Sequence, residues 1–413
     1  MKNIVRRETC RLCESTNLSL AFSLTPTPLA NNLENSESTI KPQDIYPLDI
    51  FFCNGCSHVQ LLDVVNPKLL FENYYYVSGT SSVFVKHFEE YFLYIKSRFS
   101  PSKSGLVVDI GSNDGTLLKF FKDDGYTVLG IDPAQNLSTY SKNSGIDTIV
   151  DFFSHSVANE ILAKYGKASV ITANNVFAHI DDLRSCVEAA KNLLADEGVL
   201  VFEVSSLVDV FEKKLFDTIY HEHLDYHSVK PLVIFLDSCG LKLVEVERVM
   251  SHGGSIRVSA QLKSNSRKQG ESVREALLLE SELGLDRIET IRDFYCQIDL
   301  VKYELYRLLV GLKEKGKSIV GFGAPAKMTT LLYHLGINKD LLDFIVDDSP
   351  LKQGRFTPGL HIPILDSRAL YEKKPDYVLI LAWNFSDSIV KNHSAYSNSG
   401  GKFIIPLPSI EII

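Results

Sequence analysis

The sequence lacks long apolar runs, an excess of basic residues and an even number of cysteines. None of its apolar runs approaches the roughly 18 residues of a membrane-spanning helix, so no membrane partner is expected. The basic N-terminal stretch is not followed by an apolar one, which argues against a secretory signal. A net charge of -8 argues against general binding to a nucleic acid polymer. Seven cysteines without a secretory signal argue against a disulfide framework and favour a reducing, cytoplasmic environment.

The central part of the chain alternates between apolar, β-branched stretches and helical stretches. Runs such as LVVDI, TVLGID and GVLVFEV are separated by segments with helical spacing. Regular alternation of this kind predicts a mostly parallel sheet covered on both faces. Ligands of such sheets gather at the carboxyl ends of the strands. The length of 413 residues allows two or three domains.

The run LVVDI leads into a glycine-bearing turn within residues 106–118, LVVDIGSNDGTLL. A dinucleotide site has the spacing G-x-G-x-x-G. Here Asp109 precedes Gly111 by two residues and the next glycine is Gly115, which is the D-x-G-x-x-x-G spacing of S-adenosylmethionine (SAM) sites. About 20 residues downstream, Asp132 ends the run VLGID and could bind ribose hydroxyls. A plain α/β turn without a ligand is the alternative.

Polar residues also end the other predicted strands, and their carboxyl ends share one rim. Glu203 lies on this rim, and His179 could join it, although a lone histidine after a strand is structural at least as often. The residues expected to bind the cofactor are Asp109, Gly111, Ser112, Asn113, Gly115, Asp132, Phe152, Asn174 and Asn175.

Four of the cysteines form two C-x-x-C pairs, Cys10 with Cys13 and Cys53 with Cys56. Each pair places two thiolates on one tight turn, and two such turns complete a tetrahedral zinc site. Four sulfur ligands leave no open coordination position, which predicts a structural metal. Free or redox-active thiols are the alternative. Because four cysteines are available, His58 is expected to be a surface or packing residue.

Tyr74, Tyr75 and Tyr76 form a run of tyrosines after the second cysteine pair. Composition leaves two interpretations open. The tyrosines either pack between two domains, or one phenol and nearby hydroxyls line a polar pocket.

Residues 220–227 read YHEHLDYH and concentrate histidines in one short segment. Three interpretations remain open. His221 and His223 could bind a metal, or the segment could be a solvated helix start. In the third interpretation a histidine carries out proton chemistry, and Glu222 orients it or stabilises its charged form.

The C-terminal part begins with a charged helical span from about residue 272 to 315, which we expect to connect into another domain. That domain opens with SIVGFGAPAKMTTLL, which predicts a strand, a turn through Gly321 and Gly323, and a helix carrying Lys327. Such a turn could hold the phosphates of a nucleotide at a helix N-terminus. An empty Rossmann-like lobe is the alternative.

The motifs follow one another in a specific order. The two cysteine pairs, VVDIGSNDGTLL, ANNVFAHIDDL, DTIYHEHLDYHS and GFGAPAKMTTLL span nearly the whole chain. In this order they resemble the SAM-dependent sugar C-methyltransferases, which act on nucleotide-linked keto-deoxysugars. The resemblance implies an α/β protein with a small N-terminal zinc-binding domain (1–78), a central Rossmann-like SAM-binding domain (79–270) and a C-terminal Rossmann-like domain (271–413) that helps to hold the nucleotide-sugar.

The resemblance also implies a reaction and the residues that carry it. The base of the family falls on His223. It would remove a proton next to the sugar ketone, so that the resulting enolate attacks the sulfonium methyl of SAM. The residues expected around the reacting sugar are Tyr220, Glu222, His179, Tyr74 and Tyr75.

One departure and two other functions have to be weighed against this resemblance. After His223 the chain reads LDYHS where the family commonly has Ser-Tyr-Phe-Ser, so Asp225 and His227 depart from the pattern, which bears on the sugar more than on the reaction. A nucleotide-sugar oxidoreductase or epimerase would instead use the C-terminal glycine turn for NAD. A zinc-ribbon adaptor would leave the central turn without a role. The sequence gives no indication of oligomeric state.

Overall fold

The computed structural model describes residues 3–35, 43–71, 79 and 82–413. Tyr74 and Tyr75 therefore lie outside the described residues. The chain forms two compact units. Unit 1 comprises Met1–Ser19, Phe51–Val208 and Leu224–Ile288, and unit 2 comprises Leu20–Ile50, Asp209–His223 and Glu289–Ile413. The three domain ranges expected from the sequence remain a prediction. They are continuous stretches of chain, whereas each compact unit combines several separate stretches.

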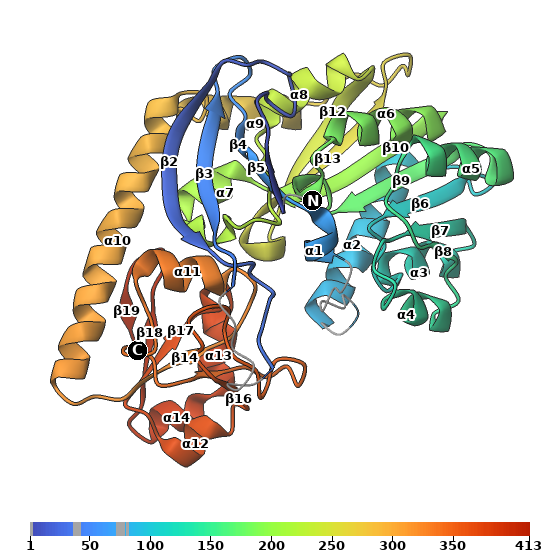
Figure 1. Ribbon diagram of the computed structural model, residues 1–413. Coiled ribbons are helices and arrows are strands. Elements are labelled where there is room, and N and C mark those ends of the chain that lie inside the picture. The colour runs from blue at the N-terminus through green and yellow to red at the C-terminus, as the bar shows by residue number, and fades with distance from the viewer. Residues whose placement is uncertain (1–2, 36–42, 72–78, 80–81) are drawn as a thin grey trace. The chain divides into compact units, whose positions relative to one another are not determined.

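Unit 1 is built around a seven-stranded sheet with the order β12-β13-β10-β9-β6-β7-β8 (Figure 1). Five neighbouring strands, β10 to β8 in this order, run parallel, and β13 is antiparallel to both β10 and β12. The expected mostly parallel sheet is therefore confirmed. Its strands are β6 (Leu106–Ile110), β7 (Thr127–Ile131), β8 (Thr148–Ile149), β9 (Ala168–Asn174), β10 (Leu194–Ser205), β12 (Leu241–Val249) and β13 (Ser255–Leu262).

Alternate side chains of the buried strands enter two different apolar cores. Val107, on strand β6, packs with α2 (Ser82–Phe99) and α3 (Thr116–Asp123) on one face. Its neighbours Leu106 and Val108 pack on the other face. Burying each such side chain contributes about 1.5 to 3 kcal/mol to stability. Because side chains alternate between the two faces of a strand, this free energy determines which face of each strand lies against each core. The helices on the second face are α5 (His155–Tyr165), α6 (Leu183–Leu193) and α8 (Val229–Ser238).

Cys10, Cys53 and Cys56 belong to the second of these cores, together with Leu12, and Cys13 packs against it. Nearby, β1 pairs antiparallel with β5. A four-stranded sheet has the order β11-β4-β3-β2, and its strands β2 and β3 carry the chain from one unit to the other and back. The bounds are β1 (Ile4–Arg6), β2 (Leu18–Thr27), β3 (Tyr46–Cys53), β4 (Val59–Leu61), β5 (Asp63–Val65) and β11 (Asp225–Tyr226).

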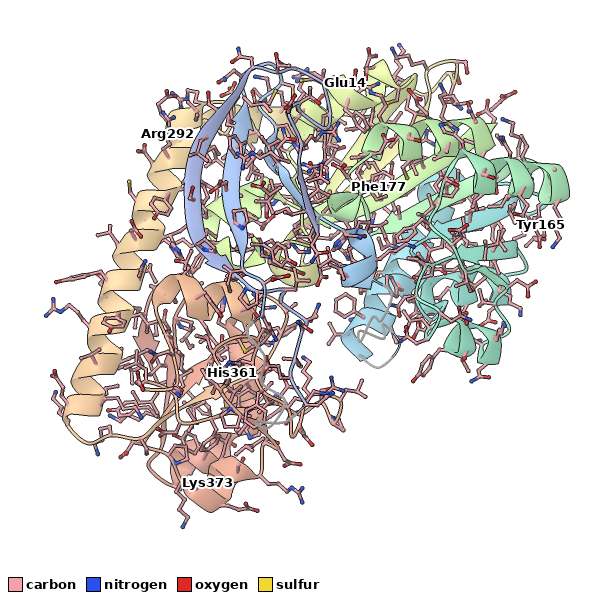
Figure 2. All side chains as sticks on the ribbon, viewed as in Figure 1. Glu14, Tyr165, Phe177, Arg292, His361 and Lys373 are labelled. Carbon is pink, nitrogen blue, oxygen red and sulfur yellow. The ribbon has the colours of Figure 1, made fainter. Side chains whose placement is uncertain are left out.

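The remaining short elements connect these strands. The helices are α1 (Pro67–Phe71), α4 (Ser138–Asn143), α7 (Leu207–Glu212) and α9 (Glu271–Glu282), and the 3-10 turns are η3 (Phe177–His179) and η5 (Ser251–Gly253). Figure 2 marks Phe177 on η3, whose ring lies 4.7 Å from that of Phe202 on β10. This contact anchors the turn that carries His179 on the central sheet.

Unit 2 contains a six-stranded sheet with the order β16-β15-β14-β17-β18-β19, in which all but β19 run parallel. This sheet confirms the second, Rossmann-like α/β region. Its strands are β14 (Ile319–Phe322), β15 (Ile345–Val346), β16 (Ile364–Leu365), β17 (Tyr377–Ile380), β18 (Lys402–Ile405) and β19 (Glu411–Ile412). The accompanying helices and 3-10 turns are η4 (Phe216–Thr218), α11 (Met328–Leu335), α12 (Ala369–Lys373), η6 (Trp383–Phe385), α13 (Ser386–Asn392) and α14 (Ser394–Asn398).

The charged span expected between residues 272 and 315 is two helices. Helix α9 ends at Glu282, and α10 (Ile288–Glu314) begins six residues later. The break contains Gly284, whose φ of +67° is one that glycine adopts without strain. Helix α10 buries a stripe at helical spacing, formed by Ile291, Phe294, Ile298, Val301, Leu305, Leu309 and Leu312. No helix in the described ranges is both long and apolar enough to cross a membrane.

Candidate active site

The glycine turn after β6 has the geometry that a ligand-binding loop requires. Gly111 has a φ of +72°, and a Cβ at this position would lie 2.4 Å from a methyl carbon of Val176. Gly115, which precedes α3, has a φ of +79°. Both positions therefore need glycine, the first for close packing and both for their left-handed backbone. The sequence spacing correctly located a tight strand-to-helix turn.

Two buried carboxylates lie at this turn. Asp132 follows β7 and accepts hydrogen bonds from the backbone amides of Asn113 at 2.9 Å and Ala134 at 2.9 Å. Burial raises the pKa of Asp132 above its usual range, although these amides favour the charged form. Asp109 accepts from the Thr172 hydroxyl at 2.6 Å, and burial raises its pKa to about 7. Asp132 thus orders the turn, and Asp109 ties β6 to β9.

The other predicted cofactor residues occupy the same edge of unit 1. Among the described residues, the buried Ser112 Oγ and Asn174 Oδ1 have no hydrogen-bond partner, which fits a site whose ligand would supply one. Asn175 adopts a φ of +54°, and its amide donates to the Glu203 carbonyl at 2.8 Å. Phe152, which follows β8, is 45% exposed. These features fit SAM.

The two cysteine pairs converge as predicted. All four sulfur atoms lie within 4.8 Å of one another. The Cys10 and Cys56 sulfurs are 3.7 Å apart, and those of Cys13 and Cys53 are 3.5 Å apart. Tetrahedral zinc with Zn–S bonds of 2.3 Å requires about 3.8 Å between sulfurs, so the donor set fits zinc closely. Within the described ranges, no other cysteine, histidine and acidic side chains form a group suited to a metal.

His58 is a buried packing residue beside this centre, as expected. Its Nε2 lies 2.6 Å from Asp225 Oδ1. Burial alone would raise the pKa of Asp225, but Arg11 and His58 lower it below the usual range. His227 is completely buried, and burial lowers its pKa to about 4. The two positions at which the sequence departs from the family pattern therefore pack around the zinc module.

Three residues of the segment YHEHL, Tyr220, Glu222 and His223, form hydrogen bonds within unit 2. His223 Nδ1 lies 2.8 Å from the Thr218 carbonyl, and its Nε2 lies 3.0 Å from the Tyr220 hydroxyl. A carbonyl can only accept, so Nδ1 carries the proton and the Nε2 lone pair accepts from the phenol. Glu222 is buried and accepts from Asn31 Nδ2 at 2.7 Å; burial raises its pKa to about 7.

The metal and solvated interpretations of this segment do not match its surroundings. His221 is 1% exposed, its Nε2 lies 3.3 Å from the Tyr46 carbonyl, and burial lowers its pKa to about 4. It is therefore a neutral packing residue. His223 points to Thr218 and Tyr220, and within the described ranges neither histidine belongs to a group suited to a metal. Proton chemistry is the interpretation that the contacts favour.

The C-terminal glycine turn also belongs to unit 2. Gly323 has a φ of +89°, and the amide of Ala324 donates to Asp347 at the end of β15 at 2.7 Å. Lys327 Nζ lies 3.1 Å from the fully buried Asp217, which also accepts from Trp383 Nε1 at 2.7 Å. Sequence reasoning named neither Asp217 nor Asp347. Asp347 could have been found from the sequence, because it follows the strand after a glycine turn in the same way as Asp132.

His179, at the end of η3, is partly buried in unit 1, and its ring meets that of Phe71 edge-on at 5.5 Å.

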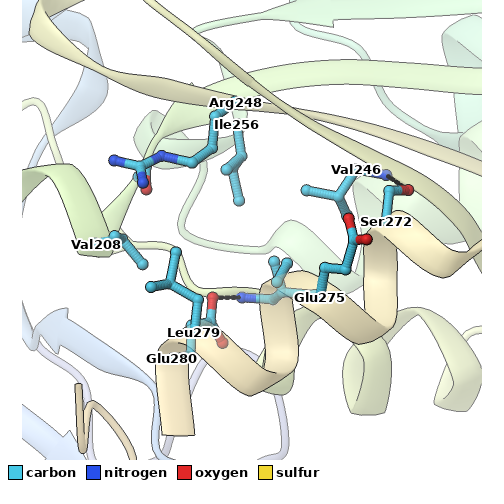
Figure 3. Close-up of a pocket in the computed structure, with 11 residues that line it drawn as sticks. Val208, Val246, Arg248, Ile256, Ser272, Glu275, Leu279 and Glu280 are labelled. Atoms are coloured by element: carbon cyan, nitrogen blue, oxygen red, sulfur yellow. Dashed lines mark hydrogen bonds between the residues drawn. The ribbon is translucent and has the colours of Figure 1, made fainter. Parts of the chain in front are cut away.

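Unit 1 also has a cavity of about 210 Å³ between β12, β13 and α9 (Figure 3). Val246, Ile256, Leu279 and other side chains line it, and none of the predicted site residues does. The cavity is therefore separate from the glycine turn.

Three family models match consecutive parts of the chain. They describe a zinc binding domain over residues 10–71, a methyltransferase domain over residues 84–246 and a C-methyltransferase C-terminal domain over residues 250–408. Their order is the order of the cysteine pairs, the glycine turn and the second α/β region.

Similarity to individual proteins differs in extent, and only NovU is similar over the whole chain among the three compared below. A structure of an S-adenosylmethionine-dependent methyltransferase from Clostridium acetobutylicum ATCC 824 is 14% identical, with a TM-score of 0.36, over 43% of this chain and 92% of that one. The ubiquinone biosynthesis O-methyltransferase of Actinobacillus pleuropneumoniae serotype 5b (strain L20) is 29% identical over 119 residues, which are 26% of this chain and 49% of that protein. C-methyltransferase NovU of Streptomyces niveus is 34% identical over 414 residues, which cover 100% of this chain and 99% of NovU. The chain therefore belongs to the SAM-dependent C-methyltransferases.

Proposed function

We propose that the enzyme methylates a carbon next to the ketone of a nucleotide-linked keto-sugar, and that His223 is the base that starts the reaction. The observation that supports this most directly is the fixed tautomer of His223. Its Nδ1 donates to the Thr218 carbonyl, which leaves Nε2 as the proton acceptor. An imidazole held in this way is suited to general base catalysis near neutral pH.

The chemistry explains why a base is needed. A sugar carbon becomes a nucleophile when the adjacent carbonyl lets its proton leave. His223 Nε2 takes that proton, and the C–H electron pair moves into an enolate. SAM supplies an electrophilic methyl group on a sulfonium. The enolate carbon forms the new C–C bond while the sulfur–methyl bond breaks, and S-adenosylhomocysteine leaves with the electron pair.

Two neighbours of His223 have roles in this proposal. The Tyr220 hydroxyl, 3.0 Å from Nε2, is a donor that could turn to the enolate oxygen once substrate binds. Glu222 is held by Asn31 and precedes His223 in the sequence, and its carboxylate would balance the charge of the protonated imidazole. His179, Tyr74 and Tyr75 complete the proposed set by family correspondence.

We assign the nucleotide part of the substrate to the C-terminal α/β region of unit 2. Gly323 opens the turn after β14, and Lys327 immediately precedes α11. A helix N-terminus attracts phosphate oxygens, and Lys327, whose charge is paired with Asp217, borders it. Because the base segment and this turn both belong to unit 2, one unit would hold both the nucleotide and the base.

The proposed substrate class is tested by mass spectrometry. Incubation of the enzyme and SAM with a panel of nucleoside diphosphate-linked keto-deoxysugars is expected to give, from at least one member, a product heavier by one CH₂ group. The matched control is the same sugar with its ketone reduced to an alcohol, which cannot form an enolate and should not react. Equal methylation of the reduced sugar would contradict the proposed enolate.

Asp132→Ala is expected to weaken SAM binding by roughly tenfold or more, because a hydrogen bond to a charged group contributes about 1.5 to 3 kcal/mol. The loss of its acceptors for Asn113 and Ala134 would also loosen the turn. Calorimetric titration with SAM measures the change. Asp123→Ala, which removes an exposed helix carboxylate, is the control. Unchanged SAM affinity in folded Asp132→Ala protein would place the ribose elsewhere.

A further inference from the structure

Arg11 stands between Cys10 and Cys13 in the first C-x-x-C turn, and its side chain is completely buried. A zinc ion held by the cysteines on either side would fix the backbone of this turn. The direction in which the arginine leaves the turn would then be set by the metal centre. A fully buried guanidinium needs partners for its donors, so its contacts reveal what the turn holds.

The guanidinium contacts Leu61, close to the second cysteine pair, and two segments that lie much farther along the sequence. Nε donates to Asp181 Oδ1 at 3.1 Å. Nη1 donates to the carbonyls of Leu61 at 2.6 Å and Leu224 at 3.3 Å. Asp181 lies two residues after His179, and Leu224 directly follows His223.

Other contacts join the same two segments to each other and to the second cysteine pair. The Leu224 amide donates to the Ala178 carbonyl at 2.7 Å. His58, two residues after Cys56, contacts Asp225 at 2.6 Å. Arg11 in the first C-x-x-C turn and His58, just after the second, thus each contact the stretch that follows His223. On the outer side of the first turn, Arg184 of α6 donates to the Leu12 carbonyl at 3.0 Å and pairs with Glu14, which Figure 2 labels.

We propose that Arg11 is a positioning residue for methyl transfer. It transmits the geometry of the zinc centre to the two segments that contain His179 and His223, residues 177–181 and 223–226. The role rests on the proposed function, in which those histidines lie at the reacting sugar. The requirement is geometric, because a displacement of about 1 Å at a reacting group can cost on the order of 10²-fold in rate.

The contacts specify arginine and not merely a positive charge. A planar guanidinium can donate from Nε in one direction and from Nη1 in another, which is how it reaches Asp181 and Leu224 together. A lysine ammonium would keep the charge beside Asp225 but has one nitrogen. Arg11→Lys therefore separates positioning from charge balance.

Three variants test the proposal. Arg11→Lys removes the planar guanidinium, and Asp181→Ala removes the acceptor of its Nε hydrogen bond. The Asp181 side chain is 44% exposed, so Asp181→Ala should fold even if Arg11→Lys does not. Arg6→Gln is the matched control, because Arg6 pairs with Asp63 and neither residue belongs to the two segments. The measurements are zinc content, SAM affinity, hydrogen exchange, and kcat and KM with the sugar that the mass-spectrometric assay identifies.

We expect all three variants to keep one zinc per chain and the SAM affinity of the natural protein. In Arg11→Lys and Asp181→Ala, the backbone amides of residues 177–181 and 223–226 should exchange at least about tenfold faster, while those of β6 stay protected. In Arg11→Lys, kcat should fall by about 10²-fold with a smaller change in KM, and Asp181→Ala should fall less. Arg6→Gln should match the natural protein.

Unchanged exchange in a folded, zinc-containing Asp181→Ala protein would overturn the proposal, and so would faster exchange with undiminished kcat. An unchanged kcat in Arg11→Lys would also overturn the proposal, because a positive charge at this position would then be sufficient. A failure of the proposed function is recognised separately. In that case His223→Gln keeps its turnover, whatever the Arg11 variants do.

Discussion

His223→Gln is expected to lower turnover by about 10²- to 10⁴-fold, the usual loss when a general base is removed. The affinities for SAM and for the sugar should change little, because the imidazole contributes to binding less than to proton transfer. The Thr218 and Tyr220 contacts that fix its Nε2 as the acceptor would be lost. His155→Gln, at the exposed start of α5, is the control and should leave turnover unchanged.

An isotope experiment isolates the proton step. Enzyme and keto-sugar are incubated in deuterated water with S-adenosylhomocysteine, so that no methyl group can be transferred. The natural protein should exchange deuterium into the position next to the carbonyl, and His223→Gln should do so at least 10²-fold more slowly. Equal exchange by both proteins would assign the base to another residue, with His179 as the next candidate because His221 is buried against the Tyr46 carbonyl.

Removal of zinc is expected to unfold the cysteine-bearing segments of unit 1, residues 3–19 and 51–65. Structural zinc contributes apparent binding free energies of about 10 to 16 kcal/mol in zinc-finger peptides at pH 7, and that free energy is folding free energy. Three of the four cysteines also belong to a core shared with α6 and α8, and Cys13 packs against it, so the loss should lower the thermal stability of the whole unit.

The measurement combines elemental analysis with thermal unfolding. Cys10→Ser and Cys53→Ser should lose zinc and unfold at a lower temperature, as the natural protein should after treatment with a chelator. Cys296→Ser is the matched control, since Cys296 is an exposed thiol outside the cluster. Absence of zinc from protein purified without chelators would contradict the assignment.

The features that could be predicted from the sequence are those set by nearby residues. Two C-x-x-C pairs dictate their own chemistry, and the hydrogen bonds by which Asp132 orders the glycine turn join residues within about 20 positions of one another. The two α/β regions and their order could also be predicted, because apolar strand sequences alternate with helical ones along the chain.

The role of YHEHL could not be resolved from spacing, because its surroundings come from distant segments. Asn31 reaches Glu222 across 191 residues, and His221 meets the Tyr46 carbonyl across 175. Asp225 posed the same difficulty. It read as a departure from the family pattern near the sugar, yet its carboxylate is paired with His58, 167 residues earlier. No local pattern carries information about such pairs.

The pairing of β11 with β4 has a consequence for biosynthesis. His58 leaves the ribosome 167 residues before Asp225 does, which at 5 to 20 residues per second is roughly 8 to 33 s. The cysteines can collect their metal as soon as Cys56 has emerged. The nascent chain must then carry Arg11 and His58 without the carbonyl and carboxylate that later enclose them. If zinc binds at that point, a metal-loaded module with exposed polar groups precedes the finished unit, and metal starvation or a chaperone would act on the enzyme at that stage.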